Sequence, residues 1–152
     1  MGRVEALCVS VRKGDRKGPV AKATFRAEHG IVGDAHAGPG RRQVSLLAAE
    51  DIDALRRAKL PDLKPGDFAE NVILSGLDLA SLGVGSRLCL GRDVVLCITQ
   101  IGKECHTPCR IYHLTGDCLM PRRGLFARVE AGGEVRVGDV ATVTEQVVRE
   151  PG

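Results

Sequence analysis

Short runs in which apolar and polar residues alternate recur along the chain, and they constrain the fold more than any other feature. In residues 20–27, for example, Lys22, Thr24 and Arg26 alternate with alanine and phenylalanine. This two-residue period is typical of a β-strand with one buried face. Other strand-like runs occupy residues 4–11, 43–47, 71–75, 87–91, 94–101, 125–129, 134–137 and 140–144. About nine short strands with little helix between them predict a mainly β protein, either a closed β-barrel or a sandwich.

The first of these runs, residues 4–11, makes the most specific prediction about strand faces. Strict alternation places Glu5 and Leu7 on one face and Val4, Ala6 and Cys8 on the other.

Three similar tripeptides are predicted to be turns: Val32-Gly33-Asp34, Val84-Gly85-Ser86 and Val137-Gly138-Asp139. In each of them an apolar residue and a small polar residue flank a glycine. Glycine takes positive φ values at little cost, so we expect a positive φ at all three glycines.

One α-helix is predicted over residues 47–59 and ends before Pro61. Acidic residues lie in its early turns and basic residues in its last, an order that suits the helix dipole. Ser45 is the predicted N-cap. A second, weaker helical pattern lies near residues 76–83.

Composition excludes several classes of function. The net charge is only +3, which is too small to predict nucleic-acid binding. The aromatic residues are one tyrosine and three phenylalanines, so the chain lacks the aromatic side chains on which single-strand nucleic-acid binders stack bases. No apolar run is long enough for a signal peptide or a membrane span. We therefore expect a cytoplasmic protein with no membrane or nucleic-acid partner. In that compartment its six cysteines stay reduced.

A glycine-rich basic stretch, residues 28–47, is the first candidate binding site. Its small residues let a ligand approach the backbone, and Arg41 and Arg42 can each bind a phosphate or carboxylate through two hydrogen bonds. The stretch has neither a Walker pattern nor a dinucleotide-binding fingerprint. The alternative is a surface loop with solvated arginines.

A cluster of thiols and imidazoles in residues 105–118 is the second candidate site. Its members are Cys105, His106, Cys109, His113 and Cys118. They offer enough ligands for zinc, although the spacing lacks a CxxC pair. They also suit a reactive thiolate, because basic residues that include Lys103 surround them.

Two other interpretations of the cysteines stay open. A Cys105–Cys109 disulfide would need a turn to bring the two residues together. Cys8, Cys89 and Cys97 lie in apolar runs and are predicted to be small core residues.

The basic pair Arg122-Arg123 follows the cysteine cluster. It favours an anionic ligand, or else it forms a solvated hairpin.

Four stretches, in this order, resemble the MOSC family, named after the C-terminal domain of molybdenum-cofactor sulfurases. They occupy residues 32–52, 65–91, 99–112 and 116–139. The resemblance runs from residue 3 to residue 144 and points to the short, stand-alone bacterial branch. We expect one domain over residues 3–144 and a flexible tail over residues 145–152.

The resemblance implies a barrel like the pyruvate-kinase β-barrel domain, and a protein that binds molybdenum cofactor (molybdopterin) or carries sulfur on a cysteine. By its position in "TPCRIY", Cys109 matches the cysteine that carries sulfur or ligates molybdenum, with Cys105 as second candidate. The cofactor itself would be bound by Arg41, Arg42, Gln43, Ser45, Lys103, Arg122 and Arg123. Partners would be proteins that supply molybdenum cofactor or sulfur.

The sequence departs from larger relatives in two respects. It contains neither the pyridoxal-phosphate domain of the sulfurases nor the additional N-terminal β domain of the amidoxime-reducing relatives. A carrier or cofactor-handling role is therefore expected, and whether the protein is itself an enzyme is left open. The alternatives are a small molybdenum-dependent oxidoreductase with a cysteine-ligated metal, and a non-catalytic zinc-binding module on Cys105, Cys109, His113 and Cys118.

Overall fold

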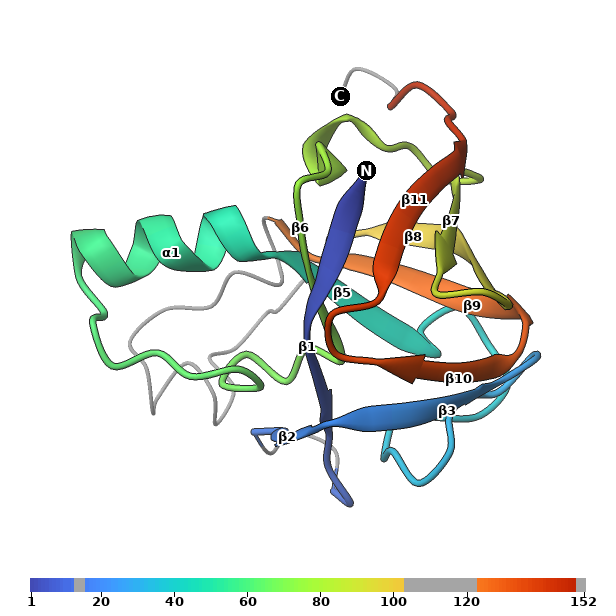
Figure 1. Ribbon diagram of the computed structural model, residues 1–152, viewed down its shortest axis with the longest axis horizontal. Helices are drawn as coiled ribbons and strands as arrows, with labels where there is room; N and C mark the ends of the chain where they lie inside the picture. The colour runs from blue at the N-terminus through green and yellow to red at the C-terminus, as the bar shows by residue number, and fades with distance from the viewer. Residues whose placement is uncertain (13–15, 103–122, 150–152) are drawn as a thin grey trace.

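The structure, a computed structural model, describes residues 1–12, 16–102 and 123–149 (Figure 1). Its strands are β1 (Gly2–Val9), β2 (Gly18–Val20), β3 (Lys22–Arg26), β4 (Gly30–Ile31), β5 (Val44–Ala48), β6 (Val72–Ser75), β7 (Arg87–Leu90), β8 (Val94–Ile101), β9 (Leu125–Ala131), β10 (Gly133–Arg136) and β11 (Val140–Glu145). One α-helix, α1 (Ala49–Ala58), and one 3-10 helix, η1 (Leu79–Ser81), complete the described elements. The prediction of a mainly β protein is confirmed.

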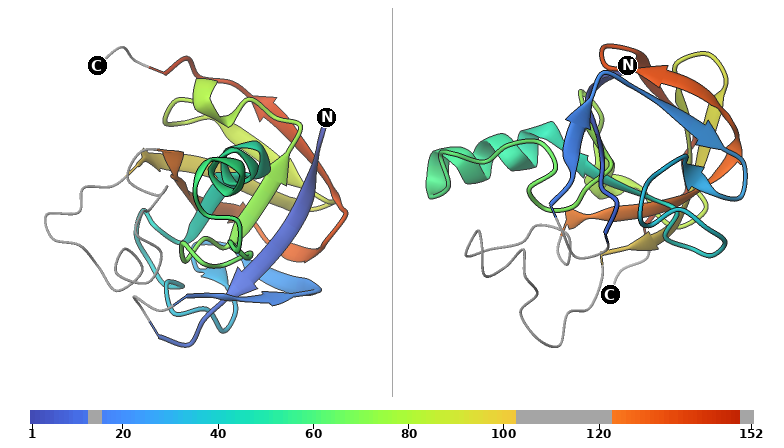
Figure 2. Two further views of the ribbon diagram at one scale, coloured as in Figure 1. Left: turned by 90° about the vertical axis from the view of Figure 1, so that its left-hand side faces the viewer. Right: turned by 90° about the horizontal axis from the view of Figure 1, so that it is seen from below.

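Seven strands close into a barrel, in the order β11-β7-β8-β9-β5-β6-β1. The ring is closed by β1 and β11, which pair antiparallel through Gly2 with Ala141 and Arg3 with Val140. The pair β5–β6 is parallel, and α1 lies on the connection between these strands. Figure 2 shows the strands as a ring with α1 projecting to one side. The closed β-barrel that the family resemblance implied is confirmed.

A second sheet, β10-β3-β4, lies across one end of the barrel (Figure 1). Its buried residues Ala23, Phe25, Ile31 and Val135 join the main core, which fills the barrel. The predicted alternation in β3 is confirmed, since Ala23 and Phe25 are buried and its other residues are exposed. The two-residue strand β4 was not predicted, because its sequence is too short to show a period.

A smaller core lies outside the barrel, where α1 covers β1, β5 and β6. Ile52 and Leu55 of α1 pack there with Cys8, Phe68 and Phe126, among others. Several barrel strands are therefore apolar on both faces. All five residues of β5 are buried, which explains why this run has no clear period in the sequence.

Strict alternation in the first strand proved wrong. Val4 and Leu7 both belong to the core inside the barrel, whereas Ala6 and Cys8 belong to the outer core. The cause is a β-bulge, because the register with β6 shifts between Val4 and Ala6. One additional residue in a strand turns all later side chains to the opposite face.

The predicted start of the helix was also wrong. Helix α1 begins at Ala49, its N-cap is Ala48 without a side-chain hydrogen bond, and Ser45 lies inside β5. Because β5 pairs with both β6 and β9, its backbone is held in the sheet up to Ala48. The weak helical pattern near residues 76–83 corresponds only to η1.

The prediction for the three glycine turns is confirmed. Gly33, Gly85 and Gly138 have φ values of 88°, 96° and 95°.

The chain between α1 and β6 is held by a buried carboxylate. Glu70 is fully buried and accepts hydrogen bonds from the backbone N–H groups of Gly66 and Phe68, each at 3.1 Å. Burial raises the pKa of Glu70 to about 7, although these N–H groups act in the opposite direction. Gly66 in turn packs against the Lys17 backbone, whose N–H donates to the Gly66 carbonyl at 2.8 Å.

Residues near the C-terminus contact the barrel next to η1. Val148 forms an isolated bridge with Leu82, and the Arg149 guanidinium donates to the Leu82 carbonyl at 3.2 Å. These residues belong to the predicted tail, residues 145–152. Within the described ranges, no helix is long and apolar enough to cross a membrane.

Replacing Gly66 with alanine is expected to destabilise the fold by roughly 2–5 kcal/mol. A Cβ at this position would lie 1.8 Å from the Lys17 carbonyl oxygen, and φ is +90°. Gly33→Ala is the matched control, because Gly33 has φ +88° but an added Cβ would meet no other atom within 4 Å. It should cost only about 1–2 kcal/mol for the backbone conformation. Urea unfolding of both variants measures the difference, and equal losses would contradict the packing argument.

Stability should decrease with rising pH because of Glu70. Its pKa is about 7 in the folded state against 4.5 as the ordinary value. Between these values the folded state binds more protons than the unfolded state, so the free energy of unfolding falls as pH rises through this range. The contribution is on the order of 3 kcal/mol. Urea unfolding from pH 4.5 to pH 8 should show a weaker decrease in Glu70→Gln than in the wild type; parallel curves would exclude this role.

Candidate functional site

The predicted cysteine site lies in a segment that the structure does not describe. Cys105, Cys109, Lys103 and Arg122 fall within residues 103–122, as do the zinc-ligand candidates His113 and Cys118. The two flanks of this segment are described. Ile101 at the end of β8 pairs with Leu125 at the start of β9, and the Gly102 N–H donates to the Gly124 carbonyl at 2.7 Å. The segment therefore leaves and re-enters the barrel at one point.

The basic stretch lies beside this point. Arg42 Nε donates to Gln100 Oε1 at 3.1 Å, and Gln100 Nε2 donates to the Gly102 carbonyl at 2.9 Å. The backbone carbonyl of Arg41 accepts a hydrogen bond from the Thr99 hydroxyl. Residues 41–42 and 99–102, far apart in sequence, are thus joined directly.

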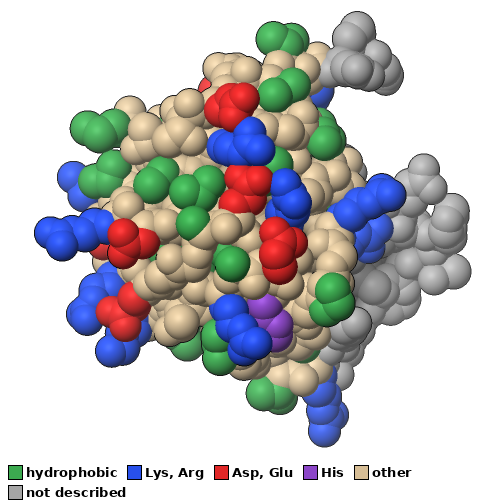
Figure 3. All heavy atoms as spheres, turned by 90° about the vertical axis from the view of Figure 1, so that its right-hand side faces the viewer, with side chains coloured by type: hydrophobic (Ala, Val, Ile, Leu, Met, Phe, Trp, Pro, Cys, Tyr) green, Lys and Arg blue, Asp and Glu red, His purple; other side chains and the backbone are tan. Residues whose placement is uncertain are grey.

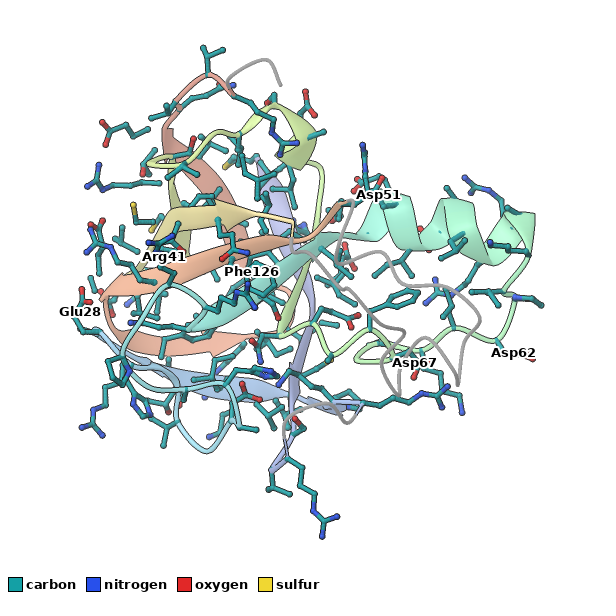
Figure 4. The ribbon with its side chains drawn as sticks, turned by 180° about the vertical axis from the view of Figure 1, so that it is seen from behind. Glu28, Arg41, Asp51, Asp62, Asp67 and Phe126 are labelled. Carbon is teal, nitrogen blue, oxygen red and sulfur yellow. The ribbon has the colours of Figure 1, made fainter. Side chains whose placement is uncertain are left out.

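Phe126 on β9 lies against one of the two arginines, Arg42. The Arg42 guanidinium carbon lies 5.4 Å from the centre of the Phe126 ring, a cation–π distance. Figure 4 looks onto this outer side of the barrel and labels Arg41 and Phe126.

The two guanidinium groups are available for a ligand. Both side chains are exposed. Within the described residues, the Arg41 guanidinium and the terminal Nη groups of Arg42 have no hydrogen-bond or ion-pair partner. Arginine groups in this state can bind phosphate or carboxylate oxygens bidentately.

A small pocket opens next to Arg42. Its volume is about 30 Å³, enough for one water-sized group. It is lined by His36, Arg42, Ser45, Phe68, Ala69, Asn71 and Phe126.

The floor of the pocket is a closed hydrogen-bond network. Asn71 Oδ1 accepts from the Ser45 N–H at 3.0 Å and lies 3.2 Å from the Ser45 hydroxyl. The Asn71 N–H donates to Ser45 Oγ at 3.0 Å, and Asn71 Nδ2 donates to the Cys8 carbonyl at 3.1 Å. Ser45 and Asn71 are both buried, and these bonds join β5, β6 and β1. Ser45 therefore helps to shape the pocket.

Gln43 is buried and holds the loop that carries the arginines. Its side-chain carbonyl accepts from the Val129 N–H at 2.9 Å, and its amide donates to the Gly40 carbonyl at 3.2 Å.

Arg123 is placed differently from Arg41 and Arg42. It binds the Asp51 carboxylate with two hydrogen bonds, at 3.0 and 2.9 Å, next to the first turn of α1. The hydrogen bonds and charge of Asp51 raise the pKa of Arg123. Of the predicted cofactor-binding residues, the structure brings Arg41, Arg42, Gln43 and Ser45 together and places Arg123 in this ion pair.

The structure adds a buried charged cluster that the sequence did not reveal. Lys17 Nζ lies 2.7 Å from Asp34 Oδ1, and both side chains are completely buried. Nζ also lies 3.2 Å from Ser10 Oγ and 2.9 Å from His36 Nδ1. Burial acts to raise the pKa of Asp34, but Lys17 and the Ser10 N–H hold it below its ordinary value. Only the turn at Asp34 was a sequence signal, and it gave no hint of Lys17.

The described cysteines do not form a reactive site. Cys8 and Cys97 are buried and Cys89 is partly buried, in agreement with a packing role, and all three are unbridged. Burial and the nearby Glu70 carboxylate raise the pKa of Cys8 to about 12. In the part of the chain that the structure describes, no three His, Cys, Asp or Glu side chains converge on a metal-sized site.

A neighbouring face of the barrel, viewed at a right angle to Figure 4, carries arginines that are already paired. Figure 3 shows acidic and basic side chains intermixed on this face. Arg87 pairs with Glu130 and Glu145, and Arg128 pairs with Glu130 and Glu28. The hydrogen bonds from Arg87 hold the pKa of Glu130 below its ordinary value. These arginines are already neutralised, unlike Arg41 and Arg42.

Comparisons with solved structures identify proteins of the same fold. YuaD from Bacillus subtilis has a TM-score of 0.76 at 24% identity, over 93% of this chain and 94% of YuaD. YiiM from Geobacillus stearothermophilus has a TM-score of 0.70 at 17% identity, over 95% of this chain and 76% of that protein. YiiM from Escherichia coli has a TM-score of 0.67 at 16% identity, over 95% and 71%. No curated protein matches the sequence.

A family model also matches the sequence, and it agrees with the resemblance found in the motifs. The MOSC domain model matches residues 32–142, which include the arginine pair, the pocket and both flanks of the cysteine segment. Because this match spans more than half of the residues, the chain belongs to the MOSC domain family, which is associated with molybdenum-cofactor binding and sulfur-related functions.

Proposed function

We propose that this MOSC domain binds a molybdopterin-type molybdenum cofactor, with Arg41 and Arg42 holding the anionic end of the ligand. The observation that supports this proposal is the pair of exposed guanidinium groups beside the pocket and next to Gly102. Arg42 is fixed by Gln100 and Phe126, so little rotational freedom is lost when an anion binds.

The described residues fit the phosphate part of such a ligand. Charge-assisted hydrogen bonds contribute about 1.5–3 kcal/mol each, and two arginines can supply several of them. The pocket holds only one water-sized group, so the pterin itself would lie over the pocket and the arginine pair. When bound, the cofactor supplies a redox-active molybdenum centre. The chain would bind and orient it, with Cys109 as the proposed metal ligand.

Sulfur transport on Cys109 is the second proposed function. It is favoured by the state of the other thiols, since Cys8 and Cys97 are buried and the pKa of Cys8 is far above neutral. The proposal therefore assigns thiolate chemistry to the cysteines of residues 105–118, where basic residues are close in sequence. A persulfide forms when the Cys109 thiolate attacks the terminal sulfur of a donor persulfide, and the donor leaves as a thiolate.

Removing the arginine pair should strongly reduce cofactor loading. Protein expressed in a host that makes molybdenum cofactor is purified, and its molybdenum and pterin contents are measured. We expect Arg41→Gln/Arg42→Gln to reduce both by at least about tenfold, given the strength of charged hydrogen bonds. Arg57→Gln/Arg92→Gln removes the same charge from two other exposed positions and should load normally. Equal loading of both double variants would refute the site.

Zinc measured in the same samples separates the metal-binding alternatives. Stoichiometric zinc without pterin would favour the zinc module on Cys105, Cys109, His113 and Cys118.

Persulfide formation should depend on Cys109 alone. Reduced protein is incubated with a persulfide-loaded sulfurtransferase, and its intact mass is measured before and after a thiol reductant. We expect an adduct of one sulfur atom that the reductant removes, because persulfides are reversible. The adduct should be absent in Cys109→Ser and retained in Cys105→Ser. An adduct that survives in Cys109→Ser would assign the sulfur to another thiol.

A further inference from the structure

The pocket beside Arg42 is built largely from two loops that are distant in sequence. Residues 34–42, here called the arginine loop, and residues 66–71, here called the pocket loop, supply five of its seven lining residues. The strand residues Ser45 and Phe126 supply the other two. The shape of the pocket therefore depends on how the two loops are held relative to each other.

Lys17 lies between these loops and contacts both. Its backbone N–H donates to the Gly66 carbonyl of the pocket loop at 2.8 Å. The contact is close, since a Cβ on Gly66 would lie 1.8 Å from the Lys17 carbonyl oxygen. The Lys17 Nζ lies 2.7 Å from Asp34 Oδ1 and 2.9 Å from His36 Nδ1, both in the arginine loop. One residue thus joins the two loops, through its backbone to one and its ammonium group to the other.

Asp34 extends this link into the arginine loop. Its Oδ1 also accepts from the Ser10 N–H at 3.0 Å, and its Oδ2 accepts from the His36 N–H at 3.2 Å. The Ala35 N–H donates to the Ser10 carbonyl at 2.7 Å. The start of the arginine loop is therefore held against Lys17 and against the residue that follows β1.

Stability alone does not explain why these two charges lie inside the protein. The side chains of Lys17 and Asp34 are both completely buried, so both have lost their hydration. A buried ion pair of this kind is often no more stabilising than apolar side chains of similar volume. It differs from apolar side chains in being directional, because each hydrogen bond fixes one partner at one position. Here the partners come from separate segments of the chain.

We propose that Lys17 is a positioning residue that, together with Asp34, locks the arginine loop against the pocket loop, and that this lock holds Arg42 in the geometry that binds an anion. The second part rests on the proposed function, because it uses the same pocket and the same arginine. A loop that is already ordered loses less entropy when its ligand binds, so the lock increases the affinity for the anion.

Hydrogen exchange of the wild type tests the lock without any variant. The backbone N–H groups of Ala35 and His36 have acceptors on the arginine-loop side, and those of Lys17 and Ala69 both donate to the Gly66 carbonyl. If one lock holds both loops, these four N–H groups open in one event and show the same dependence on urea. Independent opening of the two loops would overturn the proposal.

Removing both charges together tests whether the ion pair is the lock. Lys17→Met/Asp34→Asn leaves the net charge unchanged and no buried charge unpaired, so a cooperative unfolding transition in urea should remain. Leu90→Ala is the control for general destabilisation. It creates a cavity in the barrel core on β7, a strand that carries no pocket residue.

In the double variant the four loop N–H groups should exchange at least about tenfold faster relative to those of β8, because they lose the contacts that order them. Leu90→Ala should show no such preference for the loops. An equal acceleration of the loops and of β8 in the double variant would indicate general destabilisation and would overturn the positioning role.

Inorganic phosphate tests the consequence for anion binding without using the cofactor. Binding is followed by NMR through the backbone N–H signals of residues 41–43. We expect the double variant to bind phosphate about tenfold more weakly than the wild type, whereas Leu90→Ala, once folded, binds as the wild type does. No binding by the wild type, or equal binding by the double variant, would overturn the second part of the proposal.

The lock and the proposed function fail in different ways. Absence of cofactor from the wild type, with the exchange and phosphate effects intact, would reject only the proposed function. Independent opening of the two loops in a protein that loads cofactor normally would reject only the lock.

Discussion

Closure of the barrel by β1 and β11 is the constraint on which the rest of the structure depends. Two ladder pairs, Gly2 with Ala141 and Arg3 with Val140, join the two strands, and backbone hydrogen bonds between Val4 and residues 138–139 extend the contact. A closed ring has no free strand edges, and its inner face is filled with aliphatic side chains. Strands that are buried inside can then carry a second apolar face outside, against α1. The proposed site therefore lies on strands that are packed on both sides: Ser45, Asn71 and Phe126 belong to these strands or to their immediate flanks.

The proposed site combines two adjacent arginines whose donors are available with side-chain and backbone contacts that fix their position. Several other arginines of the described residues are already paired: Arg87 and Arg128 form a network with Glu130, and Arg123 binds Asp51. Exposed pairs of this kind add little stability, but they remove the positive charge that an anion would need. Arg41 and Arg42 keep that charge, and their position is set by Thr99, Gln100 and Phe126. The proposed anion site therefore rests on the position and free hydrogen-bonding capacity of two arginines, more than on the number of basic residues.

Behind this surface, the Lys17–Asp34 pair links a buried charge to the pocket wall. A completely buried ion pair seldom adds net stability, because both charges lose their hydration. Here the pair has additional hydrogen bonds to Ser10 and to the backbone of His36, and its third N–H contacts the imidazole. The buried pair is thus in direct contact with His36, a side chain of the pocket wall.

The sequence by itself determined the class of fold, most strand positions, the three positive-φ glycine turns and the family, because these depend on local periodicity and on residues close together in the chain. Strand faces after the bulge in β1, and the true start of α1, depended on pairing with β6 and β9 and could not be read locally. Arg41 and Arg42 were found as candidates from composition, yet nothing in the sequence separated them from Arg123, whose partner Asp51 is 72 residues away. Only the tertiary structure decided which arginines keep donors available for an anion. It also decided that Lys17, Asp34 and His36 form one cluster. Both outcomes follow from contacts between segments that are distant in sequence.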